Sequence, residues 1–183
     1  AIQPAGVDPH LRLEAVGALG SVGGEGAATA LIDLLGDPSP AIRAAAIQSF
    51  ARLDPVGFVT VLSGLDLDAH WSVRAALATV LATLTREAGE PRLRAMLDDP
   101  EPKVIPAVLD AIVKLQLPDA GEILLERLKA DDPVIRAAAA RDLEQLKPAG
   151  AAAALVEAYD RAGRDSSYVA RAAALSALTA ISP

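Results

Sequence analysis

The chain has 183 residues, of which 52% are hydrophobic and 22% charged, so it can bury a core and differs from a disordered segment. It contains no cysteine, which excludes disulfide scaffolds, cysteine-ligated metal sites and thiol catalysis. The formal net charge of −7 argues against a nucleic-acid binder, and no apolar run approaches the roughly 18 residues of a membrane span.

An arginine recurs with a 31-residue period at four positions, which are Arg12, Arg43, Arg74 and Arg136. Ile105 takes the one missing place, and Arg171 follows Arg136 by 35 residues, which implies a four-residue insertion near 159–167. Leucine or another apolar residue recurs at fixed distances from this column. Such self-similarity is the signature of a repeat architecture.

Each copy of the column predicts a helix that starts at a Pro-type position three places before the arginine and ends ten places after it. The expected spans are 9–22, 40–53, 71–84, 102–115, 133–146 and 168–181. Asp8, Ser39, Asp132 and Ser167 precede these helices as candidate N-caps. A Gly or Pro turn and a shorter apolar helix follow, as at 27–35 and 122–128. Each repeat is therefore a helix–turn–helix unit, with six long second helices and five shorter first helices.

The segment Asp37-Pro38-x-Pro40-x-Ile42-Arg43-x-Ala45-Ala46, echoed by 132–139, resembles a HEAT repeat, most of all the short bacterial, phycobilisome-lyase-like variety. The resemblance covers about 7–181. It implies an all-α fold, an α-solenoid (right-handed superhelix) of about five to six helical hairpins whose second helices line the concave face. We expect one HEAT-like domain over 1–183, with repeats near 7–36, 37–67, 68–98, 99–129, 130–160 and a partial one at 165–183.

The sequence begins and ends with a second helix, and 1–7 is too short to cover the first one. Because solenoids usually close with polar capping repeats, we expect a fragment of a longer protein. Its uncapped terminal helices would leave it monomeric or let it associate end to end.

The arginine column is interpreted as a structural ladder, and a functional basic stripe is the alternative. Its helical-wheel position predicts half-buried side chains. Three aspartates stand in the turn six residues before their arginine, where HEAT-like proteins place a ladder partner. The ladder residues are Asp37, Arg43, Asp68, Arg74, Asp165, Arg171, Arg12 and Arg136. The other turn acids are interpreted as helix caps, with an acidic edge that binds a basic partner or a divalent cation as the alternative.

The fourth copy departs from the pattern. Ile105 replaces the arginine, and Pro106 falls about five residues into the expected helix, where proline removes a backbone hydrogen bond and bends the helix. A local kink is the favoured interpretation, and the shaping of a site is the alternative.

Residues for catalysis are scarce. The two histidines, His10 and His70, lie about two repeats apart and cannot share a metal ion. HEAT-like deoxyhypusine hydroxylases bind iron through His-Glu dipeptides, but here Leu11 and Trp71 follow the histidines. No phosphate-binding loop or nucleophile elbow occurs. We therefore expect no enzyme activity, no metal and no cofactor.

The exposed side of the second helices is the candidate binding surface, and an ordinary solvated face is the alternative. Its proposed contact residues are Gln48, Arg52, Thr79, Thr83, Arg86, Asp110, Lys114, Arg141, Gln145 and the turn residue Trp71. The hypothesis is a non-catalytic scaffold for a protein or peptide, with no nucleic acid and no membrane involved. One alternative is a spacer or regulatory arm beside a peptidyl-prolyl isomerase or kinase domain. The other is bilin-lyase-like handling of a small molecule. The compartment stays open, with the cytoplasm favoured.

Overall fold

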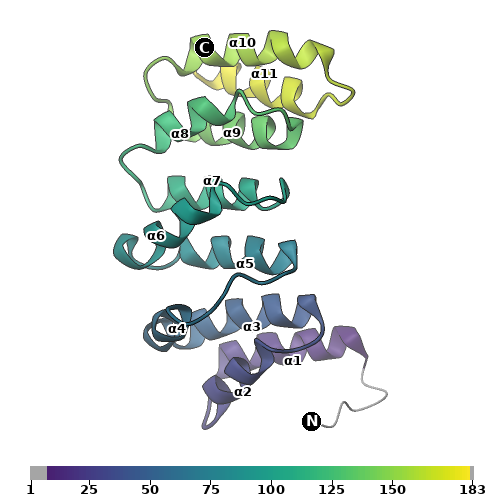
Figure 1. Cartoon of the computed structure of the whole chain (residues 1–183), viewed down its shortest axis with the longest axis vertical. Coiled ribbons are helices and arrows are strands. Elements are labelled where there is room, and N and C mark those ends of the chain that lie inside the picture. The colour runs from purple at the N-terminus through teal and green to yellow at the C-terminus, as the bar shows by residue number, and fades with distance from the viewer. Residues whose placement is uncertain (1–7, 182–183) are drawn as a thin grey trace. The chain divides into compact units, whose positions relative to one another are not determined.

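The computed structural model describes residues 8–181, which form eleven α-helices, one short 3₁₀ turn and no strand (Figure 1). The predicted all-α repeat fold is confirmed. The second helices are α1 (Pro9–Val22), α3 (Pro40–Leu53), α5 (Trp71–Leu81), α7 (Ile105–Lys114), α9 (Pro133–Leu146) and α11 (Val169–Ile181). The first helices are α2 (Ala27–Leu34), α4 (Pro55–Leu62), α6 (Arg86–Met96), α8 (Ala120–Arg127) and α10 (Ala151–Arg161), with the 3₁₀ turn at Ala162–Arg164. The segment 1–7, expected to be too short to cover the first of the second helices, lies outside the described residues.

The chain divides into two compact units, one ending at Val80 and the other beginning at Leu81. Unit 1 contains α1–α4 and nearly all of α5. Unit 2 contains α6–α11. Each unit is an array of paired helices in which a second helix packs on the next second helix and on its neighbouring first helix.

Side-chain caps start several helices. Asp8 accepts a hydrogen bond from the His10 N–H at 2.8 Å, and Asp132 accepts one from Val134 at 2.7 Å. The prediction of a capping hydroxyl at Ser39 was wrong, because it is the Ser39 backbone N–H that donates, to Asp37 Oδ1 at 2.8 Å. An Asp37 turn therefore replaces the serine cap.

The cap of α4 was not anticipated. Asp54 Oδ1 accepts from the Gly57 N–H at 2.9 Å, and a Cβ built at Gly57 would lie 2.2 Å from Asp54 Oδ2. A side chain at this place would push the carboxylate of Asp54 out of its capping position, so glycine lets this cap form.

Two second helices are shorter than predicted. Helix α5 ends at Leu81, so Thr83 lies in the following turn. Helix α7 begins at Ile105, which puts Pro106 at its second position, where a missing N–H costs no helical hydrogen bond. The prediction of a kink at an interior proline was wrong: the helix starts three residues late instead.

The core of unit 1 is built around two phenylalanines. Phe50 of α3 and Phe58 of α4 are buried and meet edge to face, with ring centroids 5.8 Å apart. Between α1 and α3 the backbones approach closely, because a Cβ on Gly20 would lie 2.5 Å from the Ser49 Cβ and 2.7 Å from its Cα. This contact requires glycine on one side and a small residue on the other.

The core of unit 2 centres on α9, which lies between α7 and α11 (Figure 1). Leu109, Leu143 and Leu155 are fully buried there, and the alanine run at 137–140 faces its neighbours without exposure. Because alanine is small, α9 packs closely against the alanines of α11.

Candidate functional site

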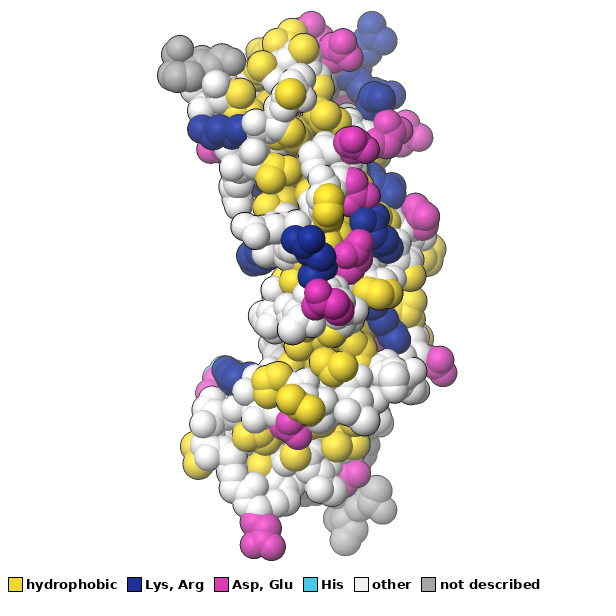
Figure 2. Space-filling model, turned by 90° about the vertical axis from the view of Figure 1, so that its left-hand side faces the viewer, with side chains coloured by type: hydrophobic (Ala, Val, Ile, Leu, Met, Phe, Trp, Pro, Cys, Tyr) yellow, Lys and Arg dark blue, Asp and Glu magenta, His cyan; other side chains and the backbone are white. Residues whose placement is uncertain are grey.

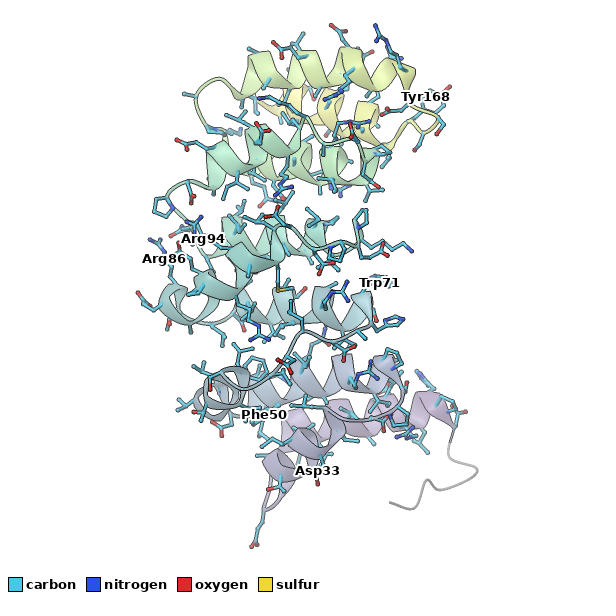
Figure 3. The ribbon with its side chains drawn as sticks, viewed as in Figure 1. Asp33, Phe50, Trp71, Arg86, Arg94 and Tyr168 are labelled. Atoms are coloured by element: carbon cyan, nitrogen blue, oxygen red, sulfur yellow. The ribbon has the colours of Figure 1, made fainter. Side chains whose placement is uncertain are left out.

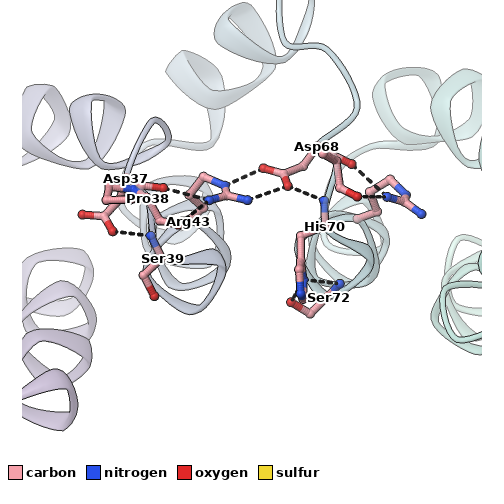
Figure 4. Close-up of polar contacts among 9 residues, drawn as sticks. Asp37, Pro38, Ser39, Arg43, Asp68, His70 and Ser72 are labelled. Carbon is pink, nitrogen blue, oxygen red and sulfur yellow. Dashed lines mark hydrogen bonds and ion pairs between the residues drawn. The ribbon is translucent and has the colours of Figure 1, made fainter.

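The arginine column joins consecutive repeats within each unit. In unit 1, Arg12 Nη2 donates to Asp37 Oδ2 at 2.6 Å, and Arg43 donates to both carboxylate oxygens of Asp68 at 2.6 and 2.8 Å (Figure 4). In unit 2, Arg136 donates to Asp165. Each such pair is called a rung here. The carboxylate comes from the repeat after the arginine, whereas the sequence had suggested the aspartate six residues before it.

Three of these arginines, Arg43, Arg74 and Arg136, also close the turn of their own repeat. In each, Nη1 donates to the carbonyl oxygen six residues earlier, at 2.8 Å for Arg43, 2.9 Å for Arg74 and 2.6 Å for Arg136. The side chains are more buried than the predicted half, with Arg136 only 4% exposed. The column is therefore engaged inside the fold and does not form a displayed basic stripe.

The hydrogen bonds of a rung also change the pKa of its carboxylate. The hydrogen bond from Arg43 lowers the pKa of Asp68 below its usual value, against the opposing effect of burial, and the His70 N–H adds to the lowering. Arg171, in the last described repeat, bonds instead to the Tyr159 hydroxyl at 3.1 Å and lies 4.5 Å from the centre of that ring.

One rung is missing in unit 2. The fourth repeat has Ile105 in the arginine column, and the fifth has Ala130 where the other rungs have aspartate. Both partners are replaced together, and both replacements lie at the boundary between α7 and α9. This boundary therefore lacks the charged link that joins α9 to α11.

A groove of about 510 Å³ opens on the second helices of unit 1, between α1 and α3. Its lining residues are Leu13, Glu14, Gly17, Ala18, Ser21, Ala45, Gln48, Ser49 and Arg52. The groove exists because α1 carries small residues on this side. A Cβ on Gly17 would meet nothing within 4 Å. Packing therefore does not require glycine there, and glycine in a helix interior lowers stability by roughly 0.5–1 kcal/mol relative to alanine.

Polar groups surround this groove. Arg52 Nη2 donates to the Gly17 carbonyl at 3.2 Å, and the Ser21 hydroxyl donates to the same oxygen at 3.0 Å. A guanidinium has five N–H donors, so Arg52 retains donors for another group. Gln48 is exposed beside it and can both donate and accept. The structure thus brings Gln48 and Arg52, two of the predicted contact residues, to one groove with Glu14 and Ser21.

In unit 2 the same face carries four more of the predicted residues. Lys114 donates to Asp110 at 2.7 Å within α7, while Arg141 and Gln145 are exposed on α9. These side chains form a mixed-charge surface.

Beneath this surface, Asp142 of α9 is 7% exposed, and its Oδ2 has no hydrogen-bond partner within residues 8–181. Burial raises the pKa of Asp142 to about 7, and the nearby Asp110 carboxylate adds to the rise. Arg141 and Lys114 oppose it. A buried carboxyl group with an unsatisfied oxygen is rare enough to require an explanation.

Three predicted contact residues line neither the groove nor the mixed-charge surface of unit 2, although Thr79 is exposed on α5. Thr79 turns its hydroxyl to the Ala75 carbonyl of its own helix at 3.1 Å, and Thr83 lies in a turn. Arg86 opens α6 and donates to the Gln116 carbonyl at 2.6 Å at the end of α7, so it holds a turn instead of extending the α5 face (Figure 3).

Trp71 stands at the first position of α5, 37% exposed, with its ring stacked on His70 at a centroid distance of 5.9 Å. Tyr168 takes the corresponding place before α11 and is 82% exposed. Both residues stand at turns (Figure 3), and neither is among the residues that line the groove between α1 and α3.

Sequence reasoning missed the small-residue lining of the groove and the buried Asp142. The signal for Asp142 is a column six residues after the arginine column. It contains Ala18, Ser49, Val80, Ala111, Asp142 and Ala177. One carboxylate in a column of small or apolar residues marks a position that the repeat pattern does not explain.

Within residues 8–181, no three His, Asp or Glu side chains gather as a metal site, and none of the helices combines the length and apolar character needed to cross a bilayer. Figure 2 shows one face of the molecule, where acidic and basic side chains alternate among apolar ones. That face has no large area of one charge.

Comparison with known proteins identifies the family. The profile of HEAT repeats matches residues 7–51 and 58–144, more than half of the chain. The chain belongs to the HEAT-repeat family. No curated protein matches it.

Two solved structures are similar to this HEAT-repeat chain. The complex of CpcE and CpcF of phycocyanin lyase from Nostoc sp. PCC7120 is 25% identical, with a TM-score of 0.46, covering 99% of this chain and 77% of that one. A designed armadillo repeat protein is 21% identical, with a TM-score of 0.46, covering 97% of this chain and 96% of that one.

Proposed function

We propose that this HEAT-repeat chain is a non-catalytic scaffold that binds a segment of a partner protein on the exposed face of its second helices. The groove between α1 and α3 would be the main docking point. The observation that supports this proposal is the groove itself, about 510 Å³ in volume, with open space above Gly17 and hydrogen-bonding side chains around it.

The chemistry of the groove favours a peptide segment with one small or medium side chain inserted. Leu13, Ala18 and Ala45 give it apolar walls, and Gln48 can bond to both the N–H and the C=O of a peptide group. Glu14 and Arg52 provide one charge of each sign. In unit 2, Asp110, Lys114, Arg141 and Gln145 would contact the partner by the same kind of mixed polar surface.

Selection of peptides tests this proposal. A random twelve-residue library displayed on phage is selected against the purified protein, and the enriched peptides are measured against variants. Gly17→Leu fills the groove and should reduce affinity by tenfold or more, whereas Gly17→Ala should reduce it little, because its methyl group leaves most of the space open. Both substitutions remove a helical glycine, so a loss confined to Gly17→Leu reports on the groove and not on helix stability.

Two further variants separate the groups around the groove. Arg52→Glu and Gln48→Ala should each weaken the same peptides, while Tyr168→Ala, at an exposed residue that does not line the groove, should not. Peptides that bind Gly17→Leu as tightly as the wild type would overturn the docking site. Absence of any enriched peptide would favour the spacer or regulatory-arm alternative.

A further inference from the structure

Helix α9 packs against two second helices in unit 2, and three independent features distinguish its contact with α7. The contact surface between two consecutive second helices is called a seam here. At the α7/α9 seam the rung is replaced by Ile105 and Ala130, whereas at the α9/α11 seam Arg136 bonds to Asp165. The α7/α9 seam therefore has no side-chain hydrogen bond at the rung position to hold its two repeats in one register.

The second feature is the length of α7. It starts three residues later than the pattern predicts, because Pro106 occupies its second position, and it ends at Lys114. Helix α7 therefore has ten residues where α9 has fourteen. Less helix surface is available on this side, and α9 packs more extensively against α11 than against α7.

The third feature is Asp142. Asp142 stands at the same repeat position as Ser49, which packs on the second helix before its own, so its side chain is directed toward α7. It is buried, and its Oδ2 lacks a partner within the described residues. The equivalent position in unit 1 is Ser49, which packs against the Gly20 backbone. A neutral carboxyl group can be tolerated in such a place, but an ionised one strongly favours exposure to water.

We propose that the α7/α9 seam is a proton-controlled opening point of unit 2, closed while Asp142 is neutral and opening once Asp142 is ionised. Opening separates α7 from α9, so that water reaches the carboxylate, while α9 and α11 stay joined by their rung. Asp110, Lys114 and Arg141 lie on the two sides of this seam. Opening therefore alters the spacing of three side chains on the exposed face, whether or not a partner binds there.

The charges around Asp142 set the pH range. On α7, Asp110 favours the neutral form, whereas Lys114 and, on α9 itself, Arg141 favour the ionised form. The remaining elements packed on α9 are α8, α10 and α11. The ionisable groups of these three helices are not among the causes of the shift in the pKa of Asp142. These groups are Glu122, Glu126, Arg127, Glu157, Tyr159, Asp160, Arg161 and Arg171.

The direction of the effect follows from linkage. The folded, closed state holds the proton on Asp142 up to a pH of about 7, while an exposed aspartate loses it near 4. The closed state is therefore favoured fully below about pH 4, progressively less up to about pH 7, and by a constant smaller amount above that. The opening constant rises by at most about tenfold per pH unit within this window.

Hydrogen exchange measured by mass spectrometry tests the proposal without any ligand. Exchange at pH 5.5 and 7.5, corrected for the intrinsic rate, is compared for peptides from 105–114, 133–146 and 169–181. In the wild type, the opening constant from the first two segments should rise about tenfold or more, and that from the third by less than about twofold. Asp142→Asn should abolish the rise, and Asp142→Ala serves as a second variant that also lacks the ionisable group.

A matched control is Asp165→Asn, which weakens the rung at the α9/α11 seam. It should increase exchange in 169–181 at both pH values and leave the pH dependence at the α7/α9 seam intact. A wild-type pH dependence that persists in both Asp142 variants would overturn the proposal, as would the absence of any rise in the wild type. Neither result bears on peptide binding to the groove of unit 1.

Discussion

Helix α9 meets α7 on one side and α11 on the other, and the two seams are built from different chemistry. Toward α11, buried alanines allow close packing, and Arg136 bonds both to Asp165 and to the carbonyls of Ala130 and Asp131. Toward α7, no rung links the repeats, and an acid with an unsatisfied oxygen lies between the helices. Repeats that share one pattern can therefore differ in how firmly each holds its neighbour.

The two seams of α9 illustrate that the free energy of unfolding of a repeat protein is a sum that includes a separate contribution from each seam. One arginine satisfies its own turn and the following repeat, so its replacement by Ile105 affects two repeats at once. The paired loss of the aspartate at Ala130 avoids an unpaired buried charge there, at the cost of a weaker link.

The largest effect is expected from breaking the strong seam. Arg136→Ala leaves Asp165 and two turn carbonyls without their donor, so the free energy of unfolding should fall by about 3 kcal/mol. Urea denaturation measures this loss. Arg12→Ala is the matched control and should cost less, because the Arg12 side chain is 37% exposed against 4% for Arg136, although its partner Asp37 is only 8% exposed. Equal losses for the two variants would contradict the ranking of the rungs by burial.

The α1/α3 seam has both a rung and a close backbone contact, and one added methyl group should destabilise it. Gly20→Ala places a Cβ against the Ser49 backbone between α1 and α3 and should destabilise by about 2 kcal/mol, since overpacking of this kind costs about 1–3 kcal/mol. Thermal unfolding followed by circular dichroism provides the measurement. A melting temperature at or above that of the wild type would show that the two helices can separate without cost.

The weak seam should respond in the opposite direction. Asp142→Asn removes the ionisable group at the α7/α9 seam and should stabilise the protein by about 1–2 kcal/mol at pH 8, within the range for an unsatisfied buried group. The folded state raises the pKa of Asp142 to about 7, so the penalty builds up between about pH 4 and 7 and the gain should vanish at pH 4. Urea denaturation at both pH values measures it. An equal gain at both would point to packing instead of ionisation.

The smallest effect concerns the other glycine of α1. Gly17→Ala meets nothing within 4 Å and should stabilise the helix by roughly 0.5–1 kcal/mol. Thermal unfolding of this variant beside Gly20→Ala tests whether Gly20 is needed for the packing of α1 on α3 while Gly17 only leaves the groove open. Destabilisation by Gly17→Ala would mean that the groove is filled in solution.

The periodic columns predicted the helices well because they reflect local chemistry. The proline at the start and the apolar spacing of 40–53 placed α3 within its observed bounds, and the same pattern placed α9. The late start of α7 was not predicted, because the 31-residue period placed Pro106 in the interior of the expected helix. The helix instead begins at Ile105, so that Pro106 takes the second position, where its missing N–H is tolerated. Local preference prevailed over the period.

The candidate site was harder to predict, since it depends on contacts between repeats. Gln48 and Arg52 were identified from their side of a helix, but the groove requires the small residues of a neighbouring helix at Gly17 and Ala18. Arg86 was misplaced because its bond to the turn after α7 joins residues 30 apart in sequence. Asp142 was overlooked because its burial shows only when the repeats are aligned at the column six residues after the arginine, and not in the residues around it.

Titration of the Asp142 carboxyl carbon by nuclear magnetic resonance in the intact protein, with Asp142→Asn used to assign the signal, tests the difference between the two seams directly. We expect a midpoint near pH 7, because the seam buries the carboxyl group beside Asp110 without a partner for Oδ2. A midpoint near pH 4 would show a hydrated or paired carboxylate and would contradict the proposed difference between the two seams of α9.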